Sequence, residues 1–209
     1  MDHFTTILLY FTSFITLVNP LGIMPVFLTM TSNLTKSQRR KTALKATITA
    51  TITLILFAFA GKYLFDFFGI SVAGLKVVGG VLFFIIGYDM LNARLSQIKV
   101  TKEEVESYVD DISITPLGIP MIAGPGSITN AIVLMGESDD LSSKMMVIIS
   151  ILLVGTVVLV SLIGAVGINR FFGESGNKIM MKLMGLIVMV IAVEFFFAGI
   201  KPYIQAILQ

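Results

Sequence analysis

The stretch VNPLGIMPVF, residues 18–27, places two prolines and a glycine inside an apolar segment that is long enough to cross a membrane. Proline removes a backbone N–H donor, and its ring clashes with the preceding helical turn. In lipid, the freed carbonyl groups must find a partner or line a water-filled cavity, because an unsatisfied backbone group is costly there. One proline alone would indicate only a kink. The paired prolines with glycine predict a broken helix or a re-entrant hairpin.

A second stretch, IPMIAGPGSI at residues 119–128, has the same character. Its Gly-Pro-Gly sequence favours a real interruption, and polar residues follow it directly. Five of the six prolines fall in or just before these two stretches: Pro20, Pro25, Pro116, Pro120 and Pro125. The sequence therefore predicts two broken helices, about a hundred residues apart.

The composition is that of a membrane protein. Hydrophobic residues make up 56% of the 209 residues and charged residues 13%, whereas soluble domains carry about 25% charged residues. No charged residue occurs from Thr5 to Thr35 or from Met145 to Asn169, and about 20 apolar residues cross a bilayer. We predict an all-α membrane protein with one domain, 1–209, and six spans: 4–30, 43–66, 70–93, 113–135, 145–169 and 179–207.

The basic residues of the loops predict the orientation of these spans, because Lys and Arg stay on the cytoplasmic side. Eleven of them share one side: Lys36, Arg39, Arg40, Lys41, Lys45, Arg94, Lys99, Lys102, Arg170, Lys178 and Lys182. The other side has four: Lys62, Lys76, Lys144 and Lys201. We therefore expect a multi-pass protein of the inner (plasma) membrane, with both termini on the non-cytoplasmic side.

The two halves of the chain resemble each other. FFGIS and GVLFFIIGYDML, at 67–71 and 80–91, match FFGES and GLIVMVIAVEFF, at 171–175 and 185–196, with shifts of 104 and 105. NPLGIMP matches IPMIAGP at a shift of 100, and a rival register pairs the two PLGI sequences. Each half has three spans, so the second half is inverted, as in many secondary transporters. We place repeat 1 at about 1–94, a charged cytoplasmic linker at about 95–112, and repeat 2 at about 113–209.

Half-helices that meet inside the membrane can bind a small ligand. Free N–H groups at a helix start favour a carboxylate, and free carbonyl groups at a helix end favour an ammonium group or a cation. A zwitterionic amino acid matches both ends. Candidate substrate-binding residues are Asn19, Pro20, Gly22, Pro25, Pro120, Gly124, Pro125, Gly126, Ser127, Thr129 and Asn130. The polar side chains among them, and Thr115, could equally cap a half-helix or bond the neighbouring turn.

Asp89 and Glu194 are the carboxylates most clearly embedded in apolar sequence, at matching positions of the two halves. Ionisable groups inside a membrane are costly and usually functional. They are therefore candidates for proton coupling. Asp89 could instead lie at the cytoplasmic interface, since Arg94 follows closely.

Several classes of protein are disfavoured. The chain has no cysteine, one histidine near its start, and no nucleotide motif, so an enzyme or an ATP-driven pump is not expected. We also expect no cofactor and no metal site. The net charge of +2 gives no indication of nucleic-acid binding.

The sequences NPLGIMPVFLTMT and TPLGIPMIAGPGSITNAIVL resemble the paired signatures of the MarC-related membrane proteins, which include the small neutral amino acid transporters called SnatA. The similarity covers essentially the whole chain. It implies a prokaryotic inner-membrane transporter for substrates such as glycine and alanine, driven by an ion gradient. The positions that match the signatures are Asn19, Pro20, Gly22, Pro25, Pro120, Gly124, Pro125, Gly126 and Ile128.

The expected function is therefore a secondary transporter that moves a small zwitterion and a coupling ion through the bilayer by alternating access. The alternatives are an exporter or flippase for another metabolite or a lipid precursor, and a channel. Assembly into a homo-oligomer is left open.

Overall fold

The computed structural model describes residues 3–92 and 105–208, and within helix α7 it leaves out the side chains of 166–175, 177, 178 and 180. Arg94, Lys99, Lys102, most of the linker and the side chains of Arg170 and Lys178 thus lie outside the described part. The elements are α1 (His3–Val18), α2 (Pro20–Met30), α3 (Lys36–Phe68), α4 (Val72–Leu91), α5 (Val105–Ile112), the irregular segment η2 (Ser113–Ile122), α6 (Pro125–Gly136) and α7 (Leu141–Ile207).

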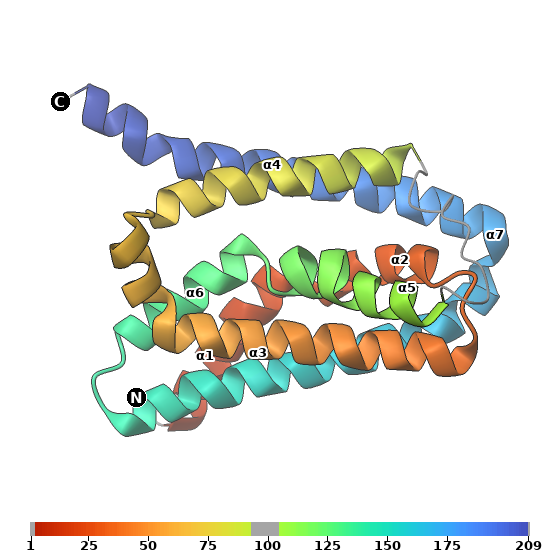
Figure 1. Cartoon of the computed structure of the whole chain (residues 1–209), viewed down its shortest axis with the longest axis horizontal. Helices are drawn as coiled ribbons and strands as arrows, with labels where there is room; N and C mark the ends of the chain where they lie inside the picture. The colour runs from red at the N-terminus through yellow and green to blue at the C-terminus, as the bar shows by residue number, and fades with distance from the viewer. Residues whose placement is uncertain (1–2, 93–104, 209) are drawn as a thin grey trace.

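Six membrane spans account for these helices. Four are continuous: Lys36–Phe68, Val72–Leu91 and, within α7, Leu141–Ala165 and Met181–Ile207. The other two are bent pairs, α1 with α2 and α5–η2 with α6. The predicted all-helical fold with broken first helices in each half is confirmed. Both chain termini lie at the same end of the bundle (Figure 1), as an even number of spans requires; which end faces the cytoplasm stays a prediction.

The long helices begin at residues whose side chains satisfy free backbone N–H groups. Thr35 and Gln38 form a capping box at the start of α3, in which the Thr35 N–H donates to Gln38 Oε1 at 2.8 Å. Ser71 caps α4 through the N–H of Gly74, and Asp140 caps α7 through the N–H of Ser143. Such caps contribute about 1 kcal/mol each. They fix where the charged loops give way to the apolar spans.

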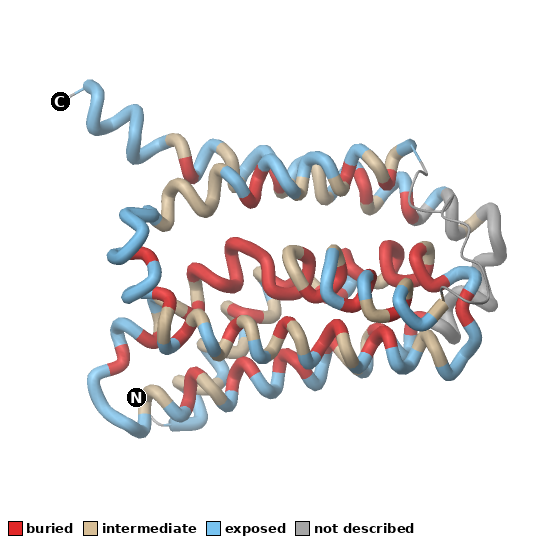
Figure 2. Tube along the Cα trace, viewed as in Figure 1, coloured by how far each residue is buried: buried red, intermediate tan, exposed pale blue. Residues whose placement is uncertain are grey.

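Burial divides the bundle into two parts. The core gathers in the two bent pairs, α3 and the first part of α7, whereas α4 and the last part of α7 show mainly exposed and half-buried residues (Figure 2). Only 17% of the most apolar window of α4 and 22% of that of Met181–Ile207 is buried. These two helices therefore form a pair whose outer surface is largely available to lipid or to a partner.

The α4–α7 pair packs through glycines. A side chain at Gly80 would meet the carbonyl oxygen of Ala192 at 2.7 Å, and one at Gly87 would meet that of Gly185 at 2.8 Å. A shift of 105 relates Gly80 to Gly185 and Gly87 to Ala192. The symmetry of the repeat therefore converts the Gly80–Ala192 contact into the Gly185–Gly87 contact. This antiparallel, self-complementary packing is what an inverted repeat requires around a two-fold axis.

The two helix starts give the same register. Helix α2 begins at Pro20 after Asn19, and α6 begins at Pro125 after Gly124. Both pairs are separated by 105 positions, the shift that relates the glycines of the α4–α7 pair. The shift of 100 expected from the paired prolines does not superpose these starts, because it matches Pro25, inside α2, with Pro125, the first residue of α6.

Helix α5 docks the linker onto the first turns of α3. Val109 and Ile112 are buried beneath it, at 1% and 4% exposure. Lys41 Nζ donates to Glu106 Oε1 at 2.7 Å, and Lys45 forms an ion pair with Asp110. The hydroxyl of Tyr108 donates to the carbonyl oxygen of Met30 at 2.9 Å. The linker is therefore tied to the last turn of α2 as well as to α3.

We expect this docking to depend on both ion pairs. Hydrogen bonds from Lys41 and Lys45, with the charges of these lysines, lower the pKa values of Glu106 and Asp110, and Glu106 raises the pKa of Lys41. The carboxylates stabilise the docked helix above their ordinary pKa values of 4.5 and 3.8 and stop doing so as the pH falls through the lowered values. Lys41 contributes below its ordinary pKa of 10.5 and stops as the pH rises through the raised value.

A charge exchange tests this contact. The change Lys45→Asp should speed hydrogen exchange of the α5 amides by up to about fivefold, and Asp110→Lys in the same chain should restore much of the protection. Exchange that is unchanged in Lys45→Asp would show that apolar burial alone holds α5.

Candidate substrate site at the two broken helices

The first break is centred on Asn19. This residue has φ 46° and ψ 69°, in the left-handed region that asparagine tolerates better than most residues. The N–H of Gly22 donates to the Asn19 carbonyl oxygen at 3.0 Å and lies 3.4 Å from Oδ1. Helices α1 and α2 meet here at 40°. The Asn19 side chain thus caps α2 and remains half-buried beside the break.

The second break is longer. Thr115 and Ile119 have extended backbones, with φ near −130°, as expected for residues that precede prolines; both Xaa-Pro bonds are cis. Helix α6 then starts at Pro125, bent by 61° from the preceding segment. The Ser127 hydroxyl lies 3.0 Å from the carbonyl oxygen of Gly124 and 3.2 Å from that of Ile122. Ser127 therefore satisfies backbone groups freed by the break.

The fold brings the two breaks together around a small cavity of about 40 Å³. Its walls are Leu17, Val18, Asn19, Ile23, Phe83, Met121, Val188 and Ile191. Two of these walls also contact the start of α6: a side chain at Gly124 would meet the Phe83 ring at 3.0 Å, and one at Gly126 would meet Leu17 at 3.3 Å. Asn19 and the start of α6 therefore flank one cavity.

An aromatic pair joins the cavity wall on α4 to α7. Phe83 and Phe195 pack edge to face, with ring centroids 6.0 Å apart, an arrangement that aromatic rings favour. A side chain at Gly126 would meet the Phe195 ring at 2.6 Å. These two phenylalanines could not be recognised from the sequence, because phenylalanines are common in apolar spans and nothing marks these two as inward-facing.

Helix α4 also holds the start of α6 in place. A side chain at Gly79 would lie 1.9 Å from Cγ of Pro125 and 2.5 Å from its Cβ. The absence of a side chain at Gly79 is what lets the proline ring sit directly on the α4 backbone. The position of the second break thus depends on α4 as well as on its own prolines.

Two polar side chains of α6 keep unused hydrogen-bonding groups. Asn130 Oδ1 accepts from the Ser13 hydroxyl at 2.9 Å, which links α6 to α1. The amide nitrogen of Asn130 and the hydroxyl of Thr129 are buried with no hydrogen-bond partner in the described part of the chain. Buried polar groups are rarely left unpaired. Thr129 and Asn130 are therefore available to a ligand or to water on α6.

The remaining predicted residues differ in how far they are buried. Pro20, Gly22 and Pro25 are buried in α2, and Pro120 is half-buried before the second break. Thr115 is exposed. Asp89 is half-buried on α4 and has an interaction partner, whereas Glu194 is exposed on α7. The two carboxylates do not line the cavity between the breaks.

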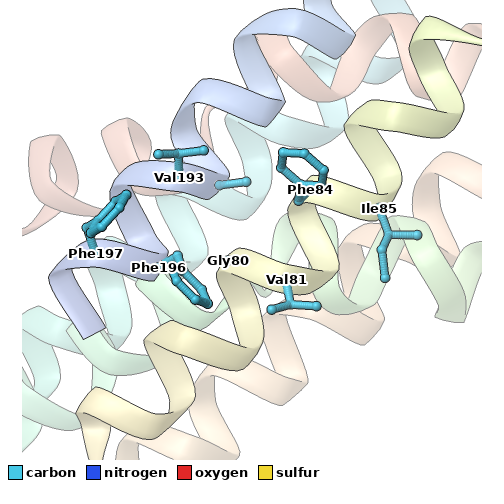
Figure 3. Close-up of a pocket in the computed structure, with 8 residues that line it drawn as sticks. Gly80, Val81, Phe84, Ile85, Val193, Phe196 and Phe197 are labelled. Atoms are coloured by element: carbon cyan, nitrogen blue, oxygen red, sulfur yellow. The ribbon is translucent and has the colours of Figure 1, made fainter. Parts of the chain in front are cut away.

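A larger hollow than this cavity has a different character. It is a groove of about 290 Å³ between α4 and α7, lined by Gly80, Val81, Phe84, Ile85, Ala192, Val193, Phe196 and Phe197 (Figure 3). These residues present only hydrocarbon side chains. A zwitterion would find no side-chain group there to replace its hydration, so the groove is not a candidate substrate site.

The ends of the half-helices define what the central cavity can bind. A helix start carries a partial positive charge and first-turn N–H groups that its own helix cannot satisfy; in α2, the N–H of Gly22 donates to Asn19. In the described part of the chain, no cluster of three His, Cys, Asp or Glu side chains could hold a metal ion. The cavity is suited to a small group with a negative end.

These features define a multi-pass integral membrane protein with two broken helices at its centre. The sequence profile described as "MarC family integral membrane protein" matches residues 4–204. The chain belongs to the MarC family.

Relatives align over nearly their whole length. A UPF0056 membrane protein of Methanocaldococcus jannaschii is 37% identical over 196 residues, covering 93% of this chain and 95% of the relative. One of Pyrococcus abyssi is 36% identical over 185 residues, covering 88% and 89%. One of Buchnera aphidicola from Schizaphis graminum is 33% identical over 209 residues, covering 100% and 98%. No solved structure matches the chain significantly.

Proposed function

We propose that the protein is a secondary transporter of small neutral amino acids such as glycine and alanine. The observation that supports it is the cavity between the two breaks: Asn19 lines this cavity, and two of its other walls, Leu17 and Phe83, lie against the start of α6. The substrate carboxylate binds the free N–H groups at the starts of α2 and α6. The ammonium group binds carbonyl oxygens freed by the breaks. Both sets of groups exist only because the helices are interrupted.

The size of the cavity supports a small substrate. A volume of about 40 Å³ holds about three water molecules by the usual measure. A ligand with a bulky side chain would have to displace Phe83 or the aliphatic walls. Glycine and alanine demand the least displacement among amino acids.

Alternating access follows from the inverted repeat. A two-fold axis relates the halves. A movement of one half that opens the cavity toward one side of the membrane therefore has an equivalent in the other half that opens it toward the opposite side. The close glycine packing of α4 against α7 joins the halves across this axis. The breaks remain near the axis while access to the cavity changes.

Uptake into proteoliposomes tests this function. The purified protein should take up radiolabelled glycine or alanine in a saturable manner when a proton or sodium gradient is imposed. Empty liposomes and liposomes without a gradient are the controls. Absence of uptake under every gradient would refute import, and linear, non-saturable flux would indicate a channel.

Glu194 remains the proposed proton-coupling carboxylate, with Asp89 as its counterpart. Glu194→Gln removes the ionisable group and keeps its size. We expect this variant to lose most of its proton-driven uptake, about tenfold or more, while exchange of internal for external substrate continues. Measuring both activities in the same vesicles separates coupling from binding, and undiminished proton-driven uptake would remove Glu194 from the mechanism.

A further inference from the structure

The outer face of α7 carries a carboxyl group at an unusual place. Glu194 lies at the middle of the span Met181–Ile207, and its side chain is exposed. Among the residues that the structure describes, it has no hydrogen-bond or ion-pair partner. Ionisable residues inside a membrane almost always face the bundle interior or pair with another group. In a single copy of the chain, Glu194 neither faces the bundle interior nor pairs with another described residue.

Glu194 points away from its own bundle. Gly185, Ala192 and Gly199 make the close contacts with α4. Successive residues of a helix are rotated by about 100°, so Glu194, two positions after Ala192, lies on nearly the opposite side. No movement of side chains within the α4–α7 pair brings α4 to this carboxyl group.

The residues around Glu194 form a stripe of the kind that packs against another helix. Leu183, Ile187, Val190, Glu194, Phe197 and Lys201 are all exposed and follow one another at intervals of four and three. This alternation is the seven-residue pattern of helices that pack side by side, and a single polar residue within such a stripe sets register and partner. The Glu194 stripe, as we define it by these six residues, thus resembles one half of a helix pair.

We propose that the Glu194 stripe is the contact surface of a homodimer, in which α7 packs against α7 of a second copy. Two copies in one membrane share their orientation, so a two-fold axis along the membrane normal makes the helices parallel and brings identical residues together. Glu194 then faces Glu194 of the second copy. A protonated carboxyl group both donates and accepts hydrogen bonds, so the pair is self-complementary. Lipid tails supply neither donor nor acceptor.

The chain has no cysteine, so single cysteines introduced into it report on this contact directly. Val190 and Val78 are matched positions: both are valines and both are 57% exposed, but Val190 lies on the Glu194 stripe and Val78 on α4. In native membranes under a mild oxidant, Val190→Cys should form a disulfide-linked dimer of twice the chain mass. Val78→Cys should stay monomeric.

The role of the carboxyl group is tested in the Val190→Cys chain. Glu194→Leu should slow cross-linking about tenfold, and Glu194→Gln should keep it, because the amide still donates and accepts. Elution from size-exclusion chromatography checks that each variant is folded. Equal cross-linking at both cysteines, no cross-linking at Val190→Cys, cross-linking insensitive to Glu194→Leu, or a product with another protein's mass would each overturn the proposal. None of these readouts depends on transport.

Discussion

Replacing Gly79 with alanine should lower the thermal midpoint of the detergent-solubilised protein by about 5–10 °C. The added methyl group would lie 1.9 Å from Cγ of Pro125, a distance that no real pair of carbon atoms adopts. The proline ring is rigid and begins α6, so either α4 or the second break must move. The usual gain of about 1 kcal/mol on replacing glycine in a helix offsets only part of this clash.

Gly164→Ala is the matched control for this variant. Gly164 also lies within a membrane-spanning helix, and a side chain there meets no atom within 4 Å. Its midpoint should stay the same or rise slightly. Equal midpoints for Gly79→Ala and the wild type would show that α4 does not hold the start of α6.

Asn19→Gly should reduce substrate affinity about tenfold or more, while the protein remains as stable as the wild type. Loss of a hydrogen bond to a charged ligand costs about 1.5–3 kcal/mol. Glycine adopts the φ of 46° seen at Asn19 without strain, and it costs only a few tenths of a kcal/mol as a helix cap. The variant therefore removes the side chain and leaves the break intact.

Asn19→Ala separates binding from capping. Alanine at a left-handed position costs about 1–2 kcal/mol, so this variant should lose stability as well as affinity. Binding is measured by isothermal titration with glycine and alanine, and stability by thermal unfolding. If Asn19→Gly binds as tightly as the wild type, Asn19 only caps α2 and has no part in recognition.

The spans and their interruptions could be predicted from the sequence because charge and proline act locally. Clusters of charged residues mark the loops between apolar spans, and a proline such as Pro125 removes a helical hydrogen bond in any context. The register of the repeat was harder to predict from the sequence. Proline fits both at the first position of a helix, like Pro20, and inside a kinked helix, like Pro25, so paired prolines alone did not determine which positions correspond.

The walls of the cavity could not be predicted in the same way. Phe83 lines the cavity because of how α4 is rotated about its axis, and Phe195 packs against Phe83 and Gly126 because of how α7 is rotated. An apolar stretch that is hydrophobic all round contains no record of that rotation. The same reason applies to Glu194. Its depth in the membrane followed from the sequence, but its exposure on the outer face followed only from the glycines that direct the opposite face toward α4.

Ser127 shows why polar residues near a break need the structure. From the sequence, its hydroxyl could bind a ligand or a backbone carbonyl group. In the structure, this hydroxyl lies within hydrogen-bond distance of the carbonyl oxygens of Gly124 and Ile122. The hydroxyl of Thr129 and the amide nitrogen of Asn130 have no hydrogen-bond partner in the described part of the chain. Ser127 therefore shapes the break, and Asn19, Thr129 and Asn130 remain as the polar side chains with spare capacity.

Substrate counterflow shows whether the protein holds a saturable site for small neutral amino acids. Proteoliposomes loaded with unlabelled glycine are diluted into a trace of labelled glycine, with no ion gradient, so that only exchange through a saturable site can concentrate the label. We expect a transient accumulation with the wild type that alanine competes away, and a much smaller one with Asn19→Gly. The absence of accumulation for both glycine and alanine, in vesicles that contain folded wild-type protein, would contradict this expectation.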